Sequence, residues 1–141
     1  MKKILLSLLL LACSMQAFAQ VSNATVNILA SAAQTATTVN TPVQLNGARK
    51  CVHVVVNVTS FTSGTYTPTV QGYDAVANVY YTLLTGAAIA GTGTTVLKVC
   101  PSITPAANVA VSDMLPPAWR VTLAGASTPS MTFSVDALLV Y

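Results

Sequence analysis

Two cysteines, Cys51 and Cys100, are the residues of this chain best placed for chemistry, because each stands at one end of a β-type run. Cys51 opens the run 51–58, and Cys100 closes the run 94–100. In antiparallel neighbours the start of one strand lies beside the end of the other, so the two side chains can meet. We therefore predict a disulfide with Cα atoms within about 7 Å of each other. Two free thiols are the alternative.

Groups that could act in acid–base or nucleophilic catalysis are scarce: the chain has one histidine, His53, and three acidic residues. Asp74 and Asp113 stand in turn-type segments, where a carboxylate accepts hydrogen bonds from its own backbone. Asp136 alternates with apolar residues in the last expected strand, so its side chain is expected to face outward. No nucleophile motif places a serine for His53, which favours a surface or packed histidine over a catalytic one. We predict that the protein is not an enzyme.

Metal and cofactor chemistry is equally poorly supported. Zinc needs three or four ligands, and His53 with two cysteines that are expected to be oxidised is a poor set. Gly86, Gly91 and Gly93 resemble turn residues rather than a phosphate-binding loop that leads into a helix. We expect no metal and no cofactor.

Aromatic residues are the other means of recognition, and four tyrosines lie close together in the sequence: Tyr66, Tyr73, Tyr80 and Tyr81. Adjacent residues of a strand face opposite ways, so one member of the pair Tyr80 and Tyr81 is expected outside. An exposed tyrosine can stack on a sugar ring or anchor a protein interface. These four residues are the predicted binding surface, and ordinary strand packing is the alternative.

The first nineteen residues predict export. Lys2 and Lys3 precede an apolar run, 4–12, that is too short to span a bilayer, and Ala17–Ala19 is a small-x-small cleavage site. Residues 1–19 are therefore the predicted signal peptide, and residues 20–141 the exported domain, in the periplasm or outside the cell. Leu10–Cys13 also approximates a lipobox, in which case Cys13 would carry a lipid that anchors the protein to a membrane.

The exported domain carries few charges, since four basic residues follow the leader against three aspartates. This balance excludes the electrostatic footprint of a nucleic-acid-binding protein and gives no basic stripe for anionic lipid. A surface made mainly of hydroxyl, amide and alanine side chains is easily buried against a partner. We predict self-association or contact with another protein assembly.

The elements that must position these residues are strands, because apolar and polar residues alternate with a period of two from Thr25 onward. We predict an all-β, single-domain antiparallel β-sandwich or jelly roll of about eight strands over residues 20–141. The parity predicts a shared core of Val54, Val56, Trp119, Val121, Phe133 and Val135. Candidate strands are 24–30, 42–46, 51–59, 69–74, 79–85, 94–100, 107–111, 118–124 and 131–140, with separating turns at Ser63–Gly64 and Gly125–Ser127.

Eight segments, in order over most of residues 28–140, make the chain resemble a family of small, mostly uncharacterised proteins of tailed phages and prophages. The resemblance implies a virion-associated β protein, such as a capsid decoration or head-surface subunit, with no catalytic residues. The alternative function is a secreted or cell-surface module that binds glycan or protein through the region 66–81. The segments are Leu29–Thr37, His53–Thr59, Val70–Asp74, Tyr80–Leu84, Gly93–Leu97, Ser112–Pro116, Trp119–Val121 and Phe133–Val135.

Overall fold

The computed structural model describes residues 22–141, which form strands and loops and contain no helix. The predicted signal peptide and Cys13 lie outside the described residues. None of the described residues forms a helix that could cross a membrane. The strands are β1 (Ala24–Gln34), β2 (Thr38–Asn40), β3 (Gln44–Leu45), β4 (Cys51–Asp74), β5 (Val79–Thr85), β6 (Gly93–Val99), β7 (Ala110–Val111) and β8 (Ala118–Val140).

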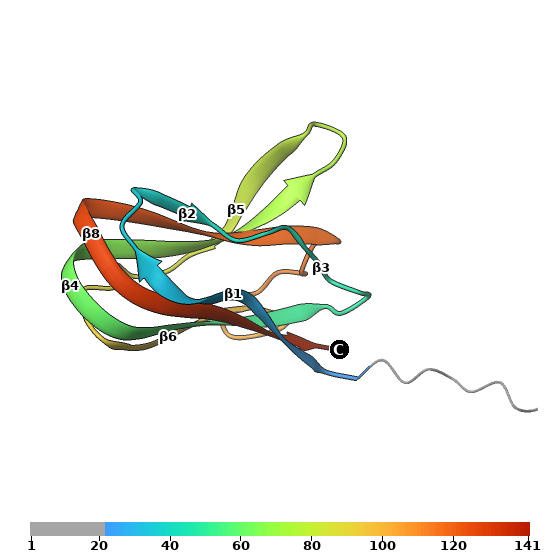
Figure 1. Ribbon diagram of the computed structural model, residues 1–141. Coiled ribbons are helices and arrows are strands. Elements are labelled where there is room, and N and C mark those ends of the chain that lie inside the picture. The colour runs from blue at the N-terminus through green and yellow to red at the C-terminus, as the bar shows by residue number, and fades with distance from the viewer. Residues whose placement is uncertain (1–21) are drawn as a thin grey trace, which may run out of the picture.

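Two long strands, β4 and β8, organise the fold. They pair antiparallel from Cys51 opposite Val140 to Gly72 opposite Trp119. The register shifts between Val58 and Thr65, so the ladder is bulged near its middle, and bulges bend a strand. Figure 1 shows both strands curving together at one side of the molecule. Each strand therefore contributes one half to each of two layers.

The two layers make a β-sandwich from one continuous hydrogen-bonded sheet. The first layer has the order β1, second half of β8, first half of β4, β6, β7. In the second layer β2 and β3 both pair with one side of the first half of β8. The other side of β8 pairs with the second half of β4, and β5 pairs with β4 to form the opposite edge of the layer. The predicted all-β sandwich is confirmed. One pair departs from the antiparallel expectation, because β6 and β7 run parallel over two residues each.

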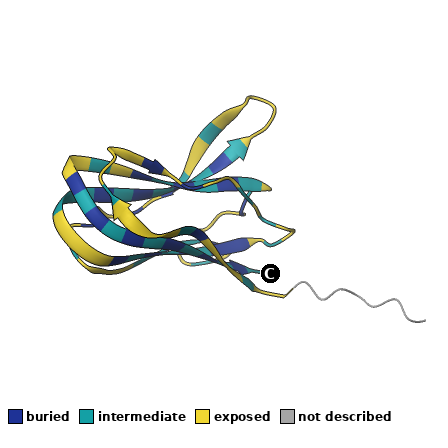
Figure 2. Cartoon of the chain, viewed as in Figure 1, coloured by how far each residue is buried: buried dark blue, intermediate teal, exposed yellow. Residues whose placement is uncertain are grey.

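The core lies between the layers and contains the residues that strand parity predicted. The side chains of Val54, Val56, Trp119, Val121, Phe133 and Val135 are all 0% exposed. Buried positions alternate with more exposed ones along β4 and β8, as Figure 2 shows. This alternation is the signature of a strand with one face on the core.

The separators predicted at Ser63–Gly64 and Gly125–Ser127 are not chain-reversing turns, and this prediction is wrong. They lie inside β4 and β8, where the strands bend from one layer into the other. Gly64 has φ +71°, and Ser127 and Thr128 have φ 56° and 48°. Left-handed backbone at these positions produces a bend without ending the pairing of the two strands.

Candidate functional site

The hairpin formed by the end of β4 and by β5 extends beyond the body of the sandwich (Figure 1). Its turn, residues 75–78, is held by Asp74, whose Oδ1 accepts hydrogen bonds from the backbone N–H groups of Val76 at 2.8 Å and Ala77 at 3.1 Å. The predicted turn role of Asp74 is therefore confirmed. Val76, at the tip, is 99% exposed.

A polar and aromatic cluster covers the outer face of this hairpin. The rings of Tyr73 and Tyr80 lie 4.9 Å apart between centroids, and the Tyr73 hydroxyl donates to Oδ1 of Asn78 at 2.6 Å. The guanidinium carbon of Arg120, from β8, lies 3.5 Å from the centroid of the Tyr80 ring. Gln71 fixes that guanidinium by accepting from its Nε at 2.9 Å. A cation stacked on a ring contributes about 0.5–2 kcal/mol, so the stacking and the two hydrogen bonds hold these side chains together as one platform.

Tyr81 lies on the opposite face of the hairpin, as the alternation of side chains along a strand requires. Its ring covers Gly72, since a Cβ added there would lie 2.5 Å from the Cζ atom of Tyr81 and 2.8 Å from Cγ of Pro116. The Tyr81 side chain is 43% exposed. The hairpin thus presents an aromatic residue on each face.

Tyr66 is not part of this surface, and its inclusion in the predicted binding surface is wrong. Only 1% of the residue is exposed, and its ring packs edge-on against Phe133 with centroids 5.2 Å apart. Its hydroxyl donates to the backbone oxygen of Ala36 at 2.7 Å, and burial raises the pKa of that hydroxyl. The physical reason is parity: Tyr66 and Tyr73 are an odd number of residues apart on β4 and so face opposite ways.

Sequence reasoning missed the partners of the tyrosines, namely Gln71, Asn78 and Arg120. The outward parity of Arg120 was visible in the alternating run around Trp119. What the sequence did not reveal is that β4 lies between β8 and β5, which places Gln71 opposite both Arg120 and Thr82. Strand neighbours of this kind are set by the whole fold.

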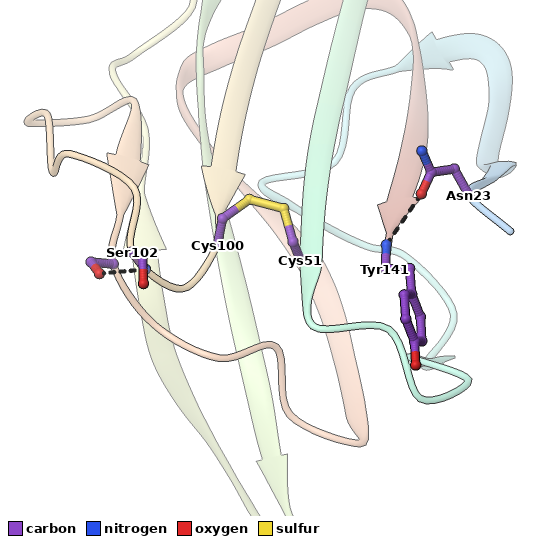
Figure 3. The surroundings of a disulfide bond; sticks show 6 residues. Asn23, Cys51, Cys100, Ser102 and Tyr141 are labelled. Carbon is purple, nitrogen blue, oxygen red and sulfur yellow. Dashed lines mark hydrogen bonds between the residues drawn. A yellow bond between two sulfur atoms is a disulfide. The ribbon is translucent and has the colours of Figure 1, made fainter. Parts of the chain in front are cut away.

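At the other end of β4, Cys51 and Cys100 form a disulfide that joins β4 to the segment after β6 (Figure 3). Their Cα atoms lie 4.3 Å apart, which confirms the predicted pairing. The disulfide agrees with an oxidising location. Close by, Oδ1 of Asn23 accepts from the backbone N–H of Tyr141 at 3.2 Å and ties the start of the described chain to its end.

His53 is half-buried on β4, two residues from Cys51 and opposite Lys98 of β6. Burial lowers the pKa of the imidazole, and the positive charge of Lys98 lowers it further. The donor atoms of Cys51, His53 and Cys100 all lie within 4.8 Å of one another. The structure therefore brings together three residues that, from the sequence, are expected to be a poor metal set.

The other carboxylates hold local structure. Asp113 Oδ1 accepts from the N–H of Met114 at 2.7 Å, and Asp136 Oδ1 accepts from the side-chain amide of Asn27 at 2.7 Å. Across residues 22–141, the cysteine–histidine group is the only set of three or more His, Cys, Asp or Glu side chains close enough to share a metal ion.

No protein-family model matches this chain, and a search of curated proteins finds no match. The likeness to phage virion proteins therefore stays a prediction.

Proposed function

We propose that this protein is a non-enzymatic structural subunit that acts by assembling with copies of itself or with another protein particle. The supporting observation is the projecting β4–β5 hairpin, which carries apolar side chains where no part of its own sandwich covers them. Val76 is 99% exposed and Val79 50% exposed. Burial of apolar surface contributes about 25 cal/mol per Å² of area removed from water. Burial of this tip against a partner therefore stabilises the complex.

The rest of the surface supports the same function. The exported domain carries four basic residues and three aspartates, so like-charge repulsion between subunits is small. The resemblance to tailed-phage proteins supports a capsid or phage-head surface as the particle. The predicted leader and the disulfide support an exported location in the periplasm or outside the cell.

The test compares the assembly of the wild-type protein with that of a variant that carries a charge at the tip of the hairpin. The full chain is expected to self-associate in sedimentation velocity, or to sediment with phage particles, and Val76→Glu is expected to abolish that behaviour. Val109→Glu is the matched control, because Val109 is 46% exposed and lies outside the hairpin. A protein that stays monomeric and free of particles, or an assembly that Val76→Glu leaves intact, would overturn the proposal.

A second candidate function is that of a secreted or cell-surface module that binds glycan or protein. The observation that favours it is the platform of Tyr73, Tyr80 and Arg120, in which a ring and a fixed cation lie on one outer face. Tyrosine faces stack on the apolar side of a sugar ring, and a guanidinium donates to its hydroxyl oxygens. This function accounts for an export signal directly.

Polysaccharide or protein binding in solution tests this second candidate. Tyr80→Ala is expected to abolish such binding, and Tyr80→Phe to preserve it, because the ring provides the stacking. Tyr141→Ala is the control, since Tyr141 is 65% exposed and is absent from the hairpin. A monomer whose binding depends on Tyr80 would favour the module over the structural subunit.

Both candidate functions, the structural subunit and the binding module, are non-enzymatic. His53 is the one histidine of the chain, and it lies opposite Lys98 and close to the sulfur atoms of the disulfide. A measurable turnover that His53→Ala destroys would overturn both.

A further inference from the structure

Three donor groups that the proposed function does not use meet where β4 begins and β6 ends. Cys51 and His53 are two residues apart on β4, so their side chains point to the same face. Cys100 follows Val99, which pairs with Val52, and this register places Cys100 opposite Cys51. The sulfur atoms and the ligating nitrogen of the imidazole lie within 4.8 Å of one another. Two strands of a hydrogen-bonded sheet thus hold all three groups in place.

The donor set selects the kind of ion. Thiolate and imidazole ligands suit soft or borderline metals such as Cu(I) and Zn(II), and do not suit Mg²⁺ or Ca²⁺. The group found in residues 22–141 supplies three ligands. Zinc held by three protein ligands keeps a water molecule in its fourth position, and the low exposure of Cys51 and Cys100, 8% and 7%, leaves little access for that water. Monovalent copper is stable with three ligands, so the number of donors favours it.

Charge and burial favour the same ion. Two thiolates around one Cu(I) carry a net charge of −1, and Lys98 lies opposite His53 in the β4–β6 ladder to balance that charge. Cys51 is 8% exposed and Cys100 7% exposed. Removal from water strengthens the attraction between the ion, its ligands and the nearby ammonium group.

We propose that the reduced form of this protein binds one Cu(I) ion through the sulfur atoms of Cys51 and Cys100 and one imidazole nitrogen of His53. A dithiol reductant prepares the site: one of its thiolates attacks a sulfur of the disulfide, and its second thiol resolves the mixed disulfide. The reductant leaves as a disulfide, and the protein gains two thiols. Cu(I) then displaces the two thiol protons without changing its oxidation state. The same two sulfur atoms either bond to each other or hold the ion.

The experiment titrates Cu(I) into the full chain under anaerobic conditions against a chromophoric Cu(I) chelator. Every sample carries Cys13→Ser, so that Cys51 and Cys100 are the only cysteines. We expect one Cu(I) per chain after reduction and none in the oxidised protein. Trp119 is the only tryptophan and is 0% exposed, so its emission reports whether the reduced chain stays folded.

Substitution of the histidine makes the test specific, because it leaves both cysteines in place. Mutation of a residue that only hydrogen-bonds to a metal ligand lowers metal affinity by about 10- to 100-fold. Loss of a ligand itself should cost at least as much, so His53→Ala is expected to weaken Cu(I) binding at least about tenfold. Asn57→Ala is the control, because Asn57 lies on the same face of β4 and belongs to no ligand set.

Four results would each overturn the proposal. These are copper uptake that His53→Ala does not weaken, equal uptake by the oxidised protein, a reduced chain that unfolds instead of binding the ion, and Zn(II) that displaces Cu(I) at equal concentration.

Discussion

Phe133 fills the centre of the core, where its ring meets Tyr66 edge-on and has no solvent exposure. We expect Phe133→Ala to lower the free energy of unfolding by roughly 3–5 kcal/mol, because it removes buried apolar area and leaves a cavity. Denaturant unfolding followed by Trp119 emission measures this loss. Ser134→Ala, at the half-buried neighbouring position, is the control and should change stability by less than about 0.5 kcal/mol. A loss below about 1 kcal/mol for Phe133→Ala would contradict its place in the core.

His53 makes the stability of the fold depend on pH. Burial and Lys98 lower the pKa of His53 below its usual value of 6.5, so the unfolded chain binds a proton more readily than the folded one. The neutral imidazole therefore favours the folded state above pH 6.5, and this contribution is lost as the pH falls through the lowered pKa.

Unfolding measured between pH 7.5 and 5 should show a decline in stability that His53→Gln reduces. Asp74 is the comparison site, because Asp74→Asn alters a carboxylate far from His53 and leaves the histidine's titration in place. Parallel profiles for the wild type and His53→Gln would show that His53 is not the group responsible.

At the scale of single residues, the sequence predicted which side chains are buried better than which side chains touch. Parity alone placed Trp119, Phe133 and the core valines correctly, because the face of a strand depends on local alternation. The contact of Arg120 with Tyr80 depends on which strands are neighbours, and no local pattern encodes that. Nearness in sequence groups Tyr66 with Tyr73, whereas the alternation of side chains along β4 places the two residues on opposite faces.

At the scale of elements, the bend in β4 is the feature that makes a sandwich from two long strands. A Cβ at Gly64, where φ is +71°, would lie 2.6 Å from the Cα atom of Pro129 and 2.7 Å from the backbone oxygen of Ala126. We expect Gly64→Ala to lower the free energy of unfolding by about 1–3 kcal/mol, since strain and backbone contact add.

Gly91 provides the matched control for this bend. A Cβ at Gly91 meets nothing within 4 Å, so Gly91→Ala should leave stability unchanged or raise it by up to about 1 kcal/mol. Thermal unfolding of the two variants side by side checks the contrast. Equal effects at the two glycines would mean that the bend does not require a left-handed residue at position 64.

Most strands could be predicted from alternation, but their continuity could not. The runs 51–59 and 69–74 are parts of one strand, β4, and the runs 118–124 and 131–140 are parts of β8. Glycine and serine between the runs are typical of turns and of bulges alike. Whether such a segment reverses the chain or bends it is decided by its pairing partner, here the opposite long strand.

At the scale of the whole molecule, the disulfide joins two cysteines that are 49 positions apart in the sequence, and the long loop that it closes constrains the unfolded chain. On the chain-entropy model, replacing both cysteines with Cys51→Ser and Cys100→Ser should lower the free energy of unfolding by about 4 kcal/mol. Urea unfolding of the oxidised wild type and of the double variant measures the difference. The wild type in excess reductant should match the double variant. Equal stability of oxidised wild type and double variant would show that the two cysteines are not joined in the isolated protein.

The position of the second half of β8 determines when the chain can fold during its synthesis. Met131–Val140 lies in the middle of its layer, between β1 and β4, so residues 24–34 and 51–58 lack their shared neighbour until position 140 has been synthesised. The sandwich therefore cannot close on the ribosome around a growing chain. An unfolded chain is also what the export predicted from the leader would require, so the late arrival of β8 agrees with that prediction.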